Sequence, residues 1–252
     1  MTIKAVIFDI EKGGVCVGSP MAGIHRFEQK NGLPRNYINV AIVQQGEHGA
    51  FQKLERGEIK LHDFYKDFGS QLSHSSNKEH YKAYLAKSGK AVPSIIPDIT
   101  VDGKELFTTM MAETARLDPN IFLAIQKLKA SGKFTIAALT NNFDLPEGDL
   151  KEAEAMGASA ADKLRALFDY FIESRLIGLR KPDPKIYHYA CKEIGIQPNE
   201  AIFLDDIGMN LRSANKIGMN TILIIIYTYA LYRGKNGRFK RRSKAARSID
   251  RS

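Results

Sequence analysis

Side chains able to bind a charged ligand lie at or near the ends of several stretches that are predicted to be strands. They are Asp9, the pair Thr140-Asn141, Lys181 and the pair Asp205-Asp206. A carboxylate at the C-terminal end of a central parallel strand lies in the crevice where open α/β folds bind their ligands. Asp205 and Asp206 place two like charges side by side, and a hard divalent cation with oxygen ligands relieves that repulsion. These residue types therefore indicate a cation site at one edge of a sheet.

The elements around these residues predict an α/β fold. Five of the six residues from Ile3 to Phe8 are apolar, which is typical of a strand buried on both faces. Further strands are predicted over 134–139, 168–173, 201–204 and 221–226, with helices over 118–132, 185–194 and 207–217. Strands that alternate with helices imply a doubly wound, Rossmann-like parallel sheet with right-handed crossovers.

A mostly helical block separates the first strand from the others. Apolar residues recur at helical spacing over 21–30, 34–45 and 51–73, with a turn at Arg56-Gly57-Glu58. The pattern continues to about residue 115, interrupted by a proline-containing loop over 89–102. We therefore predict a core formed by residues 1–19 and 116–228, a helical cap over 20–115, and a disordered basic tail over 229–252.

The charge of the chain is concentrated in this tail. From Arg233 onward nine basic residues face one acidic residue, so +8 of the net charge of +9 belongs to the tail and +1 to the rest. We expect no specific nucleic-acid partner, and at most weak contact of the tail with anionic surfaces. The longest apolar run, 222–232, is too short to span a bilayer, and no secretion signal is visible. The predicted location is cytoplasmic, and the oligomeric state stays open, a homodimer included.

Each polar position also has an ordinary structural interpretation. Asp9 could cap the turn toward Gly13-Gly14, and Lys181 could be a solvated loop residue. Thr140-Asn141 could belong to a turn, and Asp205-Asp206 could cap a helix. Four such coincidences in this order are improbable, which favours a common site.

The order, types and spacing of these residues resemble those of haloacid dehalogenase-like hydrolases. The likeness is strongest to the N-terminal phosphatase-like domain of soluble epoxide hydrolases and to related domains fused to acyl-CoA dehydrogenases. It extends from about residue 3 to 225 and includes the segments 51–60, 139–142, 171–174, 181–187 and 203–210. The resemblance implies a Mg²⁺-dependent phosphatase that acts on a small phosphomonoester, with the helical block as a cap over the crevice.

The resemblance also implies a role for each residue. Asp9 would attack phosphorus and form an aspartyl-phosphate. Lys181 would neutralise Asp9 and the phosphoryl oxygens, while Thr140 and Asn141 would bind the same group. The implied metal residues are Asp9, Asp205, Asp206 and Glu11, the last through its carbonyl, and Asp205 would also support Lys181. Gly208 and Asn210 would orient the acidic pair.

The first motif departs from the family pattern at Glu11 and Lys12. Phosphatases of this family carry an aspartate at the position of Glu11, which serves as general acid and then as general base. Glu11 is one methylene longer and would have to fold back to reach the leaving oxygen. Alternatively, Glu11-Lys12 forms a bulge that leaves the position without a proton carrier, and general acid-base help worth about 10² to 10⁴-fold is lost.

Two other functions remain open from the sequence. Some family members hydrolyse carbon-halogen bonds with an aspartate nucleophile and no metal, although the pair Asp205-Asp206 argues against that reaction here. A catalytically weakened or inactive member could instead serve as a binding module, and Glu11-Lys12 is the feature that favours this alternative.

Overall fold

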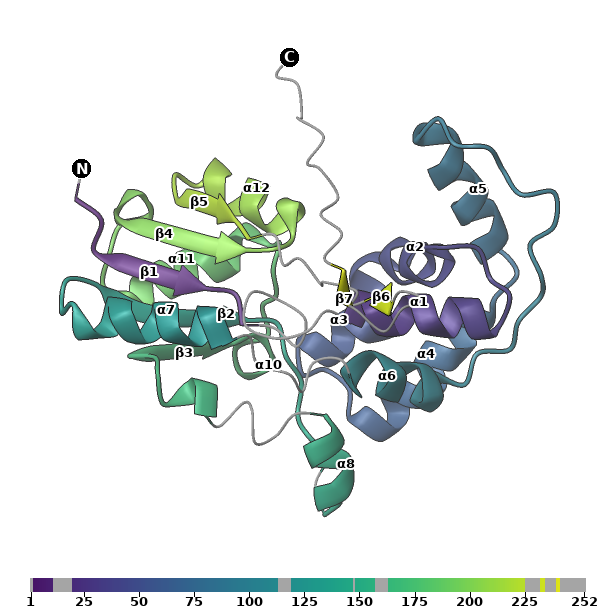
Figure 1. Ribbon diagram of the computed structural model, residues 1–252, viewed down its shortest axis with the longest axis horizontal. Helices are drawn as coiled ribbons and strands as arrows, with labels where there is room; N and C mark the ends of the chain where they lie inside the picture. Colours follow the sequence, from purple (N-terminus) through teal and green to yellow (C-terminus); the bar gives the residue numbers. More distant parts are fainter. Residues whose placement is uncertain are drawn as a thin grey trace.

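Five parallel strands form the sheet that carries the predicted site (Figure 1). The computed structural model describes residues 2–10, 20–112, 119–146, 148–156, 163–224, 232–233 and 239–240, with the backbone alone for Ala155, 232–233 and 239–240. The strand order is β3-β2-β1-β4-β5. The strands are β1 (Ala5–Phe8), β2 (Thr135–Thr140), β3 (Tyr170–Glu173), β4 (Ala201–Asp205) and β5 (Asn220–Leu223). The predicted doubly wound parallel sheet is confirmed.

The first strand occupies the centre of the sheet because all of its residues are apolar and buried. Phe8 is in register with Ala138 of β2 on one side and with Leu204 of β4 on the other. The N–H of Asp9 continues the β4 ladder by donating to the Leu204 carbonyl at 2.8 Å. Asp9 therefore lies level with the end of β4, next to Asp205.

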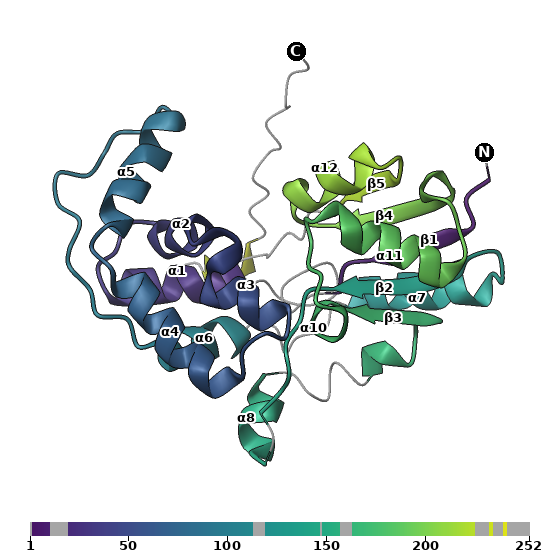
Figure 2. The ribbon, with the colours of Figure 1, turned by 180° about the vertical axis from the view of Figure 1, so that it is seen from behind.

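Alternate residues of β1 enter two different cores, one on each face of the sheet. Ile7 packs with side chains of α11 (Pro184–Ile194) and α12 (Gly208–Lys216). Val6 and Phe8 pack with α7 (Pro119–Ala130) and with Leu164 and Phe168. Figures 1 and 2 view the sheet from opposite sides, with α7 in front in the first and α11 in front in the second.

The helices between β1 and β2 form a third core beside the sheet (Figure 1). They are α1 (Pro20–Lys30), α2 (Tyr37–Gln44), α3 (Ala50–Glu55), α4 (Leu61–Ser73), α5 (Asn77–Lys87) and α6 (Gly103–Met111), with a 3-10 turn at Gly46–His48. Phe64 lies at the centre of this core, with ring centroids 4.7 Å from Phe68 and 4.8 Å from Phe107. Phe107 also contacts Phe143, which follows β2. The helices therefore pack against the loop after β2, and the exact domain boundaries stay a prediction.

The remaining elements are short. They are α8 (Leu150–Ala155), α10 (Ser174–Ile177), a 3-10 turn at Pro198–Glu200, and the antiparallel pair β6 (Tyr232–Arg233) and β7 (Phe239–Lys240). The last two lie within the predicted basic tail, most of which is outside the described residues. In the part of the chain that the structure describes, no helix is long and apolar enough to cross a membrane.

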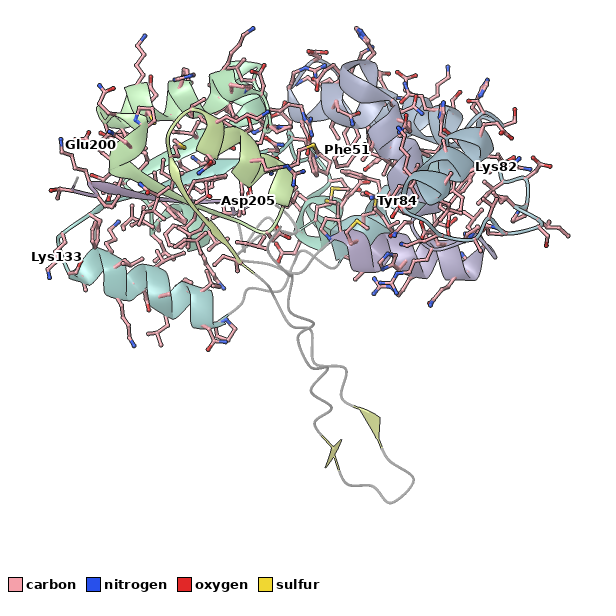
Figure 3. All side chains as sticks on the ribbon, turned by 90° about the horizontal axis from the view of Figure 1, so that it is seen from above. Phe51, Lys82, Tyr84, Lys133, Glu200 and Asp205 are labelled. Atoms are coloured by element: carbon pink, nitrogen blue, oxygen red, sulfur yellow. The ribbon has the colours of Figure 1, made fainter. Side chains whose placement is uncertain are left out.

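Figure 3 shows which end of the sheet faces the helices. Asp205, at the end of β4, lies on the side toward the helical core, whereas Glu200, just before β4, lies at the far side. The carboxyl ends of the parallel strands therefore point toward the helices. This is the edge at which open α/β sheets bind ligands.

Candidate active site

A buried lysine meets two buried carboxylates at this edge of the sheet. The Nζ atom of Lys181 lies 2.6 Å from Oδ1 of Asp9 and 3.5 Å from Oδ2 of Asp205. All three side chains are 0% exposed. Charges removed from water in this way are stable only when they are paired and hydrogen-bonded. The solvated-loop interpretation of Lys181 is therefore wrong.

Both the main chain and the side chain of Lys181 form hydrogen bonds that hold it in place. Its N–H donates to Oδ1 of Asn141 at 2.8 Å, and its carbonyl accepts from Nδ2 of Asn141 at 3.1 Å. Its ammonium also donates to the Leu139 carbonyl at 3.0 Å. The end of β2 and the loop after it thus fix the position of the lysine against Asp9.

Asp205 is fixed by donors on the following loop and on α12. Its Oδ1 accepts from the N–H of Ile207 at 2.6 Å, and its Oδ2 accepts from Nδ2 of Asn210 at 3.0 Å. The Asn210 carbonyl in turn accepts from the hydroxyl of Tyr187 at 3.0 Å. Asn210 therefore orients Asp205, and Gly208 is the first residue of α12, the helix that carries Asn210.

Asp206 completes a cluster of three carboxylates. One oxygen from each of Asp9, Asp205 and Asp206 lies within 4.8 Å of the others. Burial, together with the negative charges of Asp9 and Asp205, raises the pKa of Asp206 to about 7. Its Oδ1 is buried and has no hydrogen-bond partner among the described residues. A hard cation with oxygen ligands would satisfy that oxygen and oppose the repulsion between the three groups.

The other predicted residues divide into two groups. Thr140 and Asn141 lie at and just after the end of β2, and both are buried. Glu11, with Lys12, lies outside the described residues, so its predicted roles stay predictions. Asn141 is predicted to bind the substrate, and in the structure its side-chain amide binds the main chain of Lys181.

Two residues near the site received no role from the sequence. Glu55 and Arg180 form a largely buried ion pair directly before Lys181, with Nη2 of Arg180 2.6 Å from Oε2 of Glu55. Glu55 lies within the segment 51–60, which resembles the family, and Arg180 directly precedes Lys181. Their proximity to each other has no signal in a single sequence.

Comparisons with known proteins agree with this geometry. The model of the haloacid dehalogenase-like hydrolase family matches residues 3–218. This chain belongs to the haloacid dehalogenase-like hydrolase family.

Haloacid dehalogenase-like relatives of the chain include longer proteins. It is 33% identical over 221 residues to mouse acyl-CoA dehydrogenase family member 10, covering 88% of this chain and 18% of the relative. It is 30% identical over 224 residues to mouse bifunctional epoxide hydrolase 2, covering 89% of this chain and 37% of the relative. The chain thus spans well under half the length of these relatives.

A solved haloacid dehalogenase family enzyme from Bacteroides thetaiotaomicron, in complex with magnesium and inorganic phosphate, has the same fold. The superposition has a TM-score of 0.50 at 18% identity and covers 88% of this chain and 93% of that one. At 18% sequence identity, this similarity shows a shared fold and nothing further.

Proposed function

We propose that this chain is a Mg²⁺-dependent phosphatase that acts on a small phosphomonoester through an aspartyl-phosphate at Asp9. The observation that carries the proposal is the 2.6 Å contact between Lys181 and Asp9 inside a cluster of three carboxylates. A phosphoryl group is transferred mainly by positioning and by stabilisation of its charge. A buried nucleophile, an ammonium group and a cation site at one sheet edge supply both.

The residues at this edge would divide the work of phosphoryl transfer. Asp9 would attack phosphorus, forming an oxygen-phosphorus bond as the bond to the leaving oxygen breaks. Lys181 would pair with Asp9 and then neutralise the phosphoryl oxygens, which carry the charge in the transition state. Thr140 would donate a hydrogen bond to the same group. Water would then release inorganic phosphate and regenerate Asp9.

The carboxylate cluster fits the proposed Mg²⁺. Asp9, Asp206 and the main-chain carbonyl of Glu11 would hold the ion, with Asp205 beside them. Bound there, Mg²⁺ would supply positive charge for the transferring phosphoryl group. The buried Oδ1 of Asp206, which has no hydrogen-bond partner in the described part of the chain, supports this assignment.

The same cluster argues against hydrolysis of a carbon-halogen bond without metal. Such a reaction needs one ionised aspartate and no cation. Here Lys181 offers one positive charge to Asp9 and Asp205, and burial beside these two carboxylates raises the pKa of Asp206 to about 7. The metal-free reaction gives no role to the two further carboxylates of this site.

A phosphate-release screen tests the proposal. A panel of phosphorylated metabolites is offered with Mg²⁺ and with a chelator, to this chain and to a version that lacks Glu11-Lys12. We expect release that depends on Mg²⁺. In a parallel assay with a haloacid, halide release in the presence of chelator would favour the carbon-halogen reaction. Mg²⁺ binding without turnover of any phosphate would favour the binding module.

Removing the charge of Asp206 should stabilise the metal-free protein at high pH. Because the folded pKa of about 7 lies above the usual carboxyl value, this group stabilises the fold fully only below about pH 4. That contribution is lost as the pH rises toward 7. Without metal, Asp206→Asn should therefore raise the melting temperature by at least about 3 °C at pH 8 and by much less at pH 5.

The same melting curves test the cation site. Mg²⁺ should raise the melting temperature of the parent protein at pH 8, because it binds the folded state alone. The Asp206→Asn variant should lose most of this response. An equal response of parent and variant would remove Asp206 from the site.

Glu11 can be tested through the leaving group of the substrate. If Glu11 protonates the leaving oxygen, Glu11→Gln should slow hydrolysis of an alkyl phosphate about 10² to 10⁴-fold. An acidic phenol leaves as its phenolate without protonation. For an aryl phosphate of such a phenol, the rate of aspartyl-phosphate formation in pre-steady-state measurements should therefore be nearly unchanged in Glu11→Gln. Equal losses for both substrates would contradict the assignment of Glu11 as general acid.

A further inference from the structure

The ion pair between Glu55 and Arg180 joins the helical core to the loop that presents Lys181. Glu55 is the last residue of α3, and its side chain is 8% exposed. Its Oε2 accepts from Nε of Arg180 at 2.7 Å and lies 2.6 Å from Nη2. Two contacts from a planar guanidinium restrict both the position and the rotation of Arg180. This restriction acts one residue before Lys181.

The main chain at the end of α3 packs against the start of α10 (Figure 2). The carbonyl of Glu55 accepts from the hydroxyl of Ser174, which begins α10. Gly57 has φ +72°, and a Cβ atom there would lie 2.5 Å from the Arg175 carbonyl oxygen. Only a residue without a side chain allows this close approach. The end of α3 is therefore held by contacts of main chain as well as of charge.

The contacts of this turn reach both loops of the candidate site. Arg180 precedes Lys181, whose main chain is bonded on the other side to Asn141. Ser174 accepts from the N–H of Asn142 at 2.9 Å, directly after Asn141. The end of α3 thus lies against the two segments that must keep Lys181 and Asn141 together.

We propose that Glu55 is a positioning residue that holds Arg180, and through it Lys181, against Asp9. The inference rests on the proposed phosphatase function for its catalytic consequence. It also makes a structural claim about Lys181 that is independent of turnover. In this account the helical segment contributes to the geometry of the phosphoryl-binding lysine as well as covering the crevice.

The test compares Glu55→Gln and Arg180→Met with Glu58→Gln. Glu58 lies three residues after Glu55, is 46% exposed and pairs with Arg56 on the same turn, so it is a matched control. With an aryl phosphate and saturating Mg²⁺, each of the first two variants should lower kcat about tenfold or more with KM nearly unchanged. Arg180 also lies 4.0 Å from Glu47, so the double variant should be no slower than Arg180→Met alone. The control should stay within about twofold of the parent.

Amide hydrogen exchange followed by mass spectrometry gives a readout that needs no turnover. The N–H of Lys181 is buried and bonded to Asn141, so its exchange should speed up by at least about tenfold in Glu55→Gln and stay slow in Glu58→Gln. If Glu55→Gln does not fold, Arg180→Lys takes its place under the same criteria. Parent-like exchange at Lys181 overturns the inference, as do losses in kcat that multiply in the double variant. A parent that hydrolyses no phosphate, yet shows the exchange result, overturns the proposed function alone.

Discussion

Asp9→Asn is expected to abolish phosphate release, with kcat lower by at least about 10³-fold, because an amide cannot serve as the nucleophile and the remaining groups act as a unit with it. The side chains of aspartate and asparagine have nearly the same shape. The 2.6 Å contact with Lys181 can be kept through the amide oxygen. The loss should therefore be one of chemistry rather than of folding, and steady-state kinetics on an aryl phosphate measure it.

A matched control for this variant is Asp63→Asn. Asp63 lies in the first turn of α4, and its side chain is 74% exposed. Its replacement should leave kcat within about twofold of the parent. Substantial activity in a correctly folded Asp9→Asn protein would eliminate the aspartyl-phosphate route.

Lys181→Met should reduce both turnover and stability. Methionine has a similar length, but it leaves the buried Asp9 and Asp205 without their cation. Breaking a buried pair in this way lowers the free energy of unfolding by about 3–5 kcal/mol. Loss of one group that stabilises the transition state should lower kcat by about 10² to 10³-fold. Denaturant unfolding without metal and kinetics with Mg²⁺ measure the two effects separately.

The control for Lys181→Met is the same change at Lys185, an exposed residue in the first turn of α11. It should alter neither quantity appreciably. Mg²⁺ should restore part of the stability of Lys181→Met, since it offers positive charge to the same carboxylates. A Lys181→Met protein as stable and active as the Lys185→Met protein would show that the lysine has no role in the site.

The sheet and its site could be predicted because two local signals coincide. Apolar runs such as Ile3–Phe8 indicate buried strands, and a polar residue directly after each run indicates the ligand-binding edge. Since parallel strands end at one edge, Asp9 and Asp205 were expected at the same edge, and the pairing of β1 with β4 brings them close together. The ends of the strands were harder to predict. The strand predicted over 168–173 begins at Tyr170, because the apolar side chain of Phe168 packs in the core on one face of the sheet without belonging to the strand.

Contacts that depend on how loops and helices dock could not be predicted. Glu55 and Arg180 are 125 residues apart, and each alone is an ordinary charged residue. The binding of the Lys181 main chain by the side chain of Asn141 depends on the path of two loops, which no periodic pattern encodes. Such contacts follow from tertiary packing, and they are what distinguishes a rigid site from a set of suitable residues.

The central claim, that Asp9 itself takes the phosphoryl group, can be tested by acid quench during the first turnover. The parent enzyme is mixed with an excess of aryl phosphate and Mg²⁺, stopped within milliseconds, and digested for mass spectrometry. We predict a phosphoryl group on Asp9 that forms at least as fast as phosphate is released and is absent from Asp9→Asn. Rapid turnover with an unmodified Asp9, or with the phosphoryl group on another residue, would contradict it.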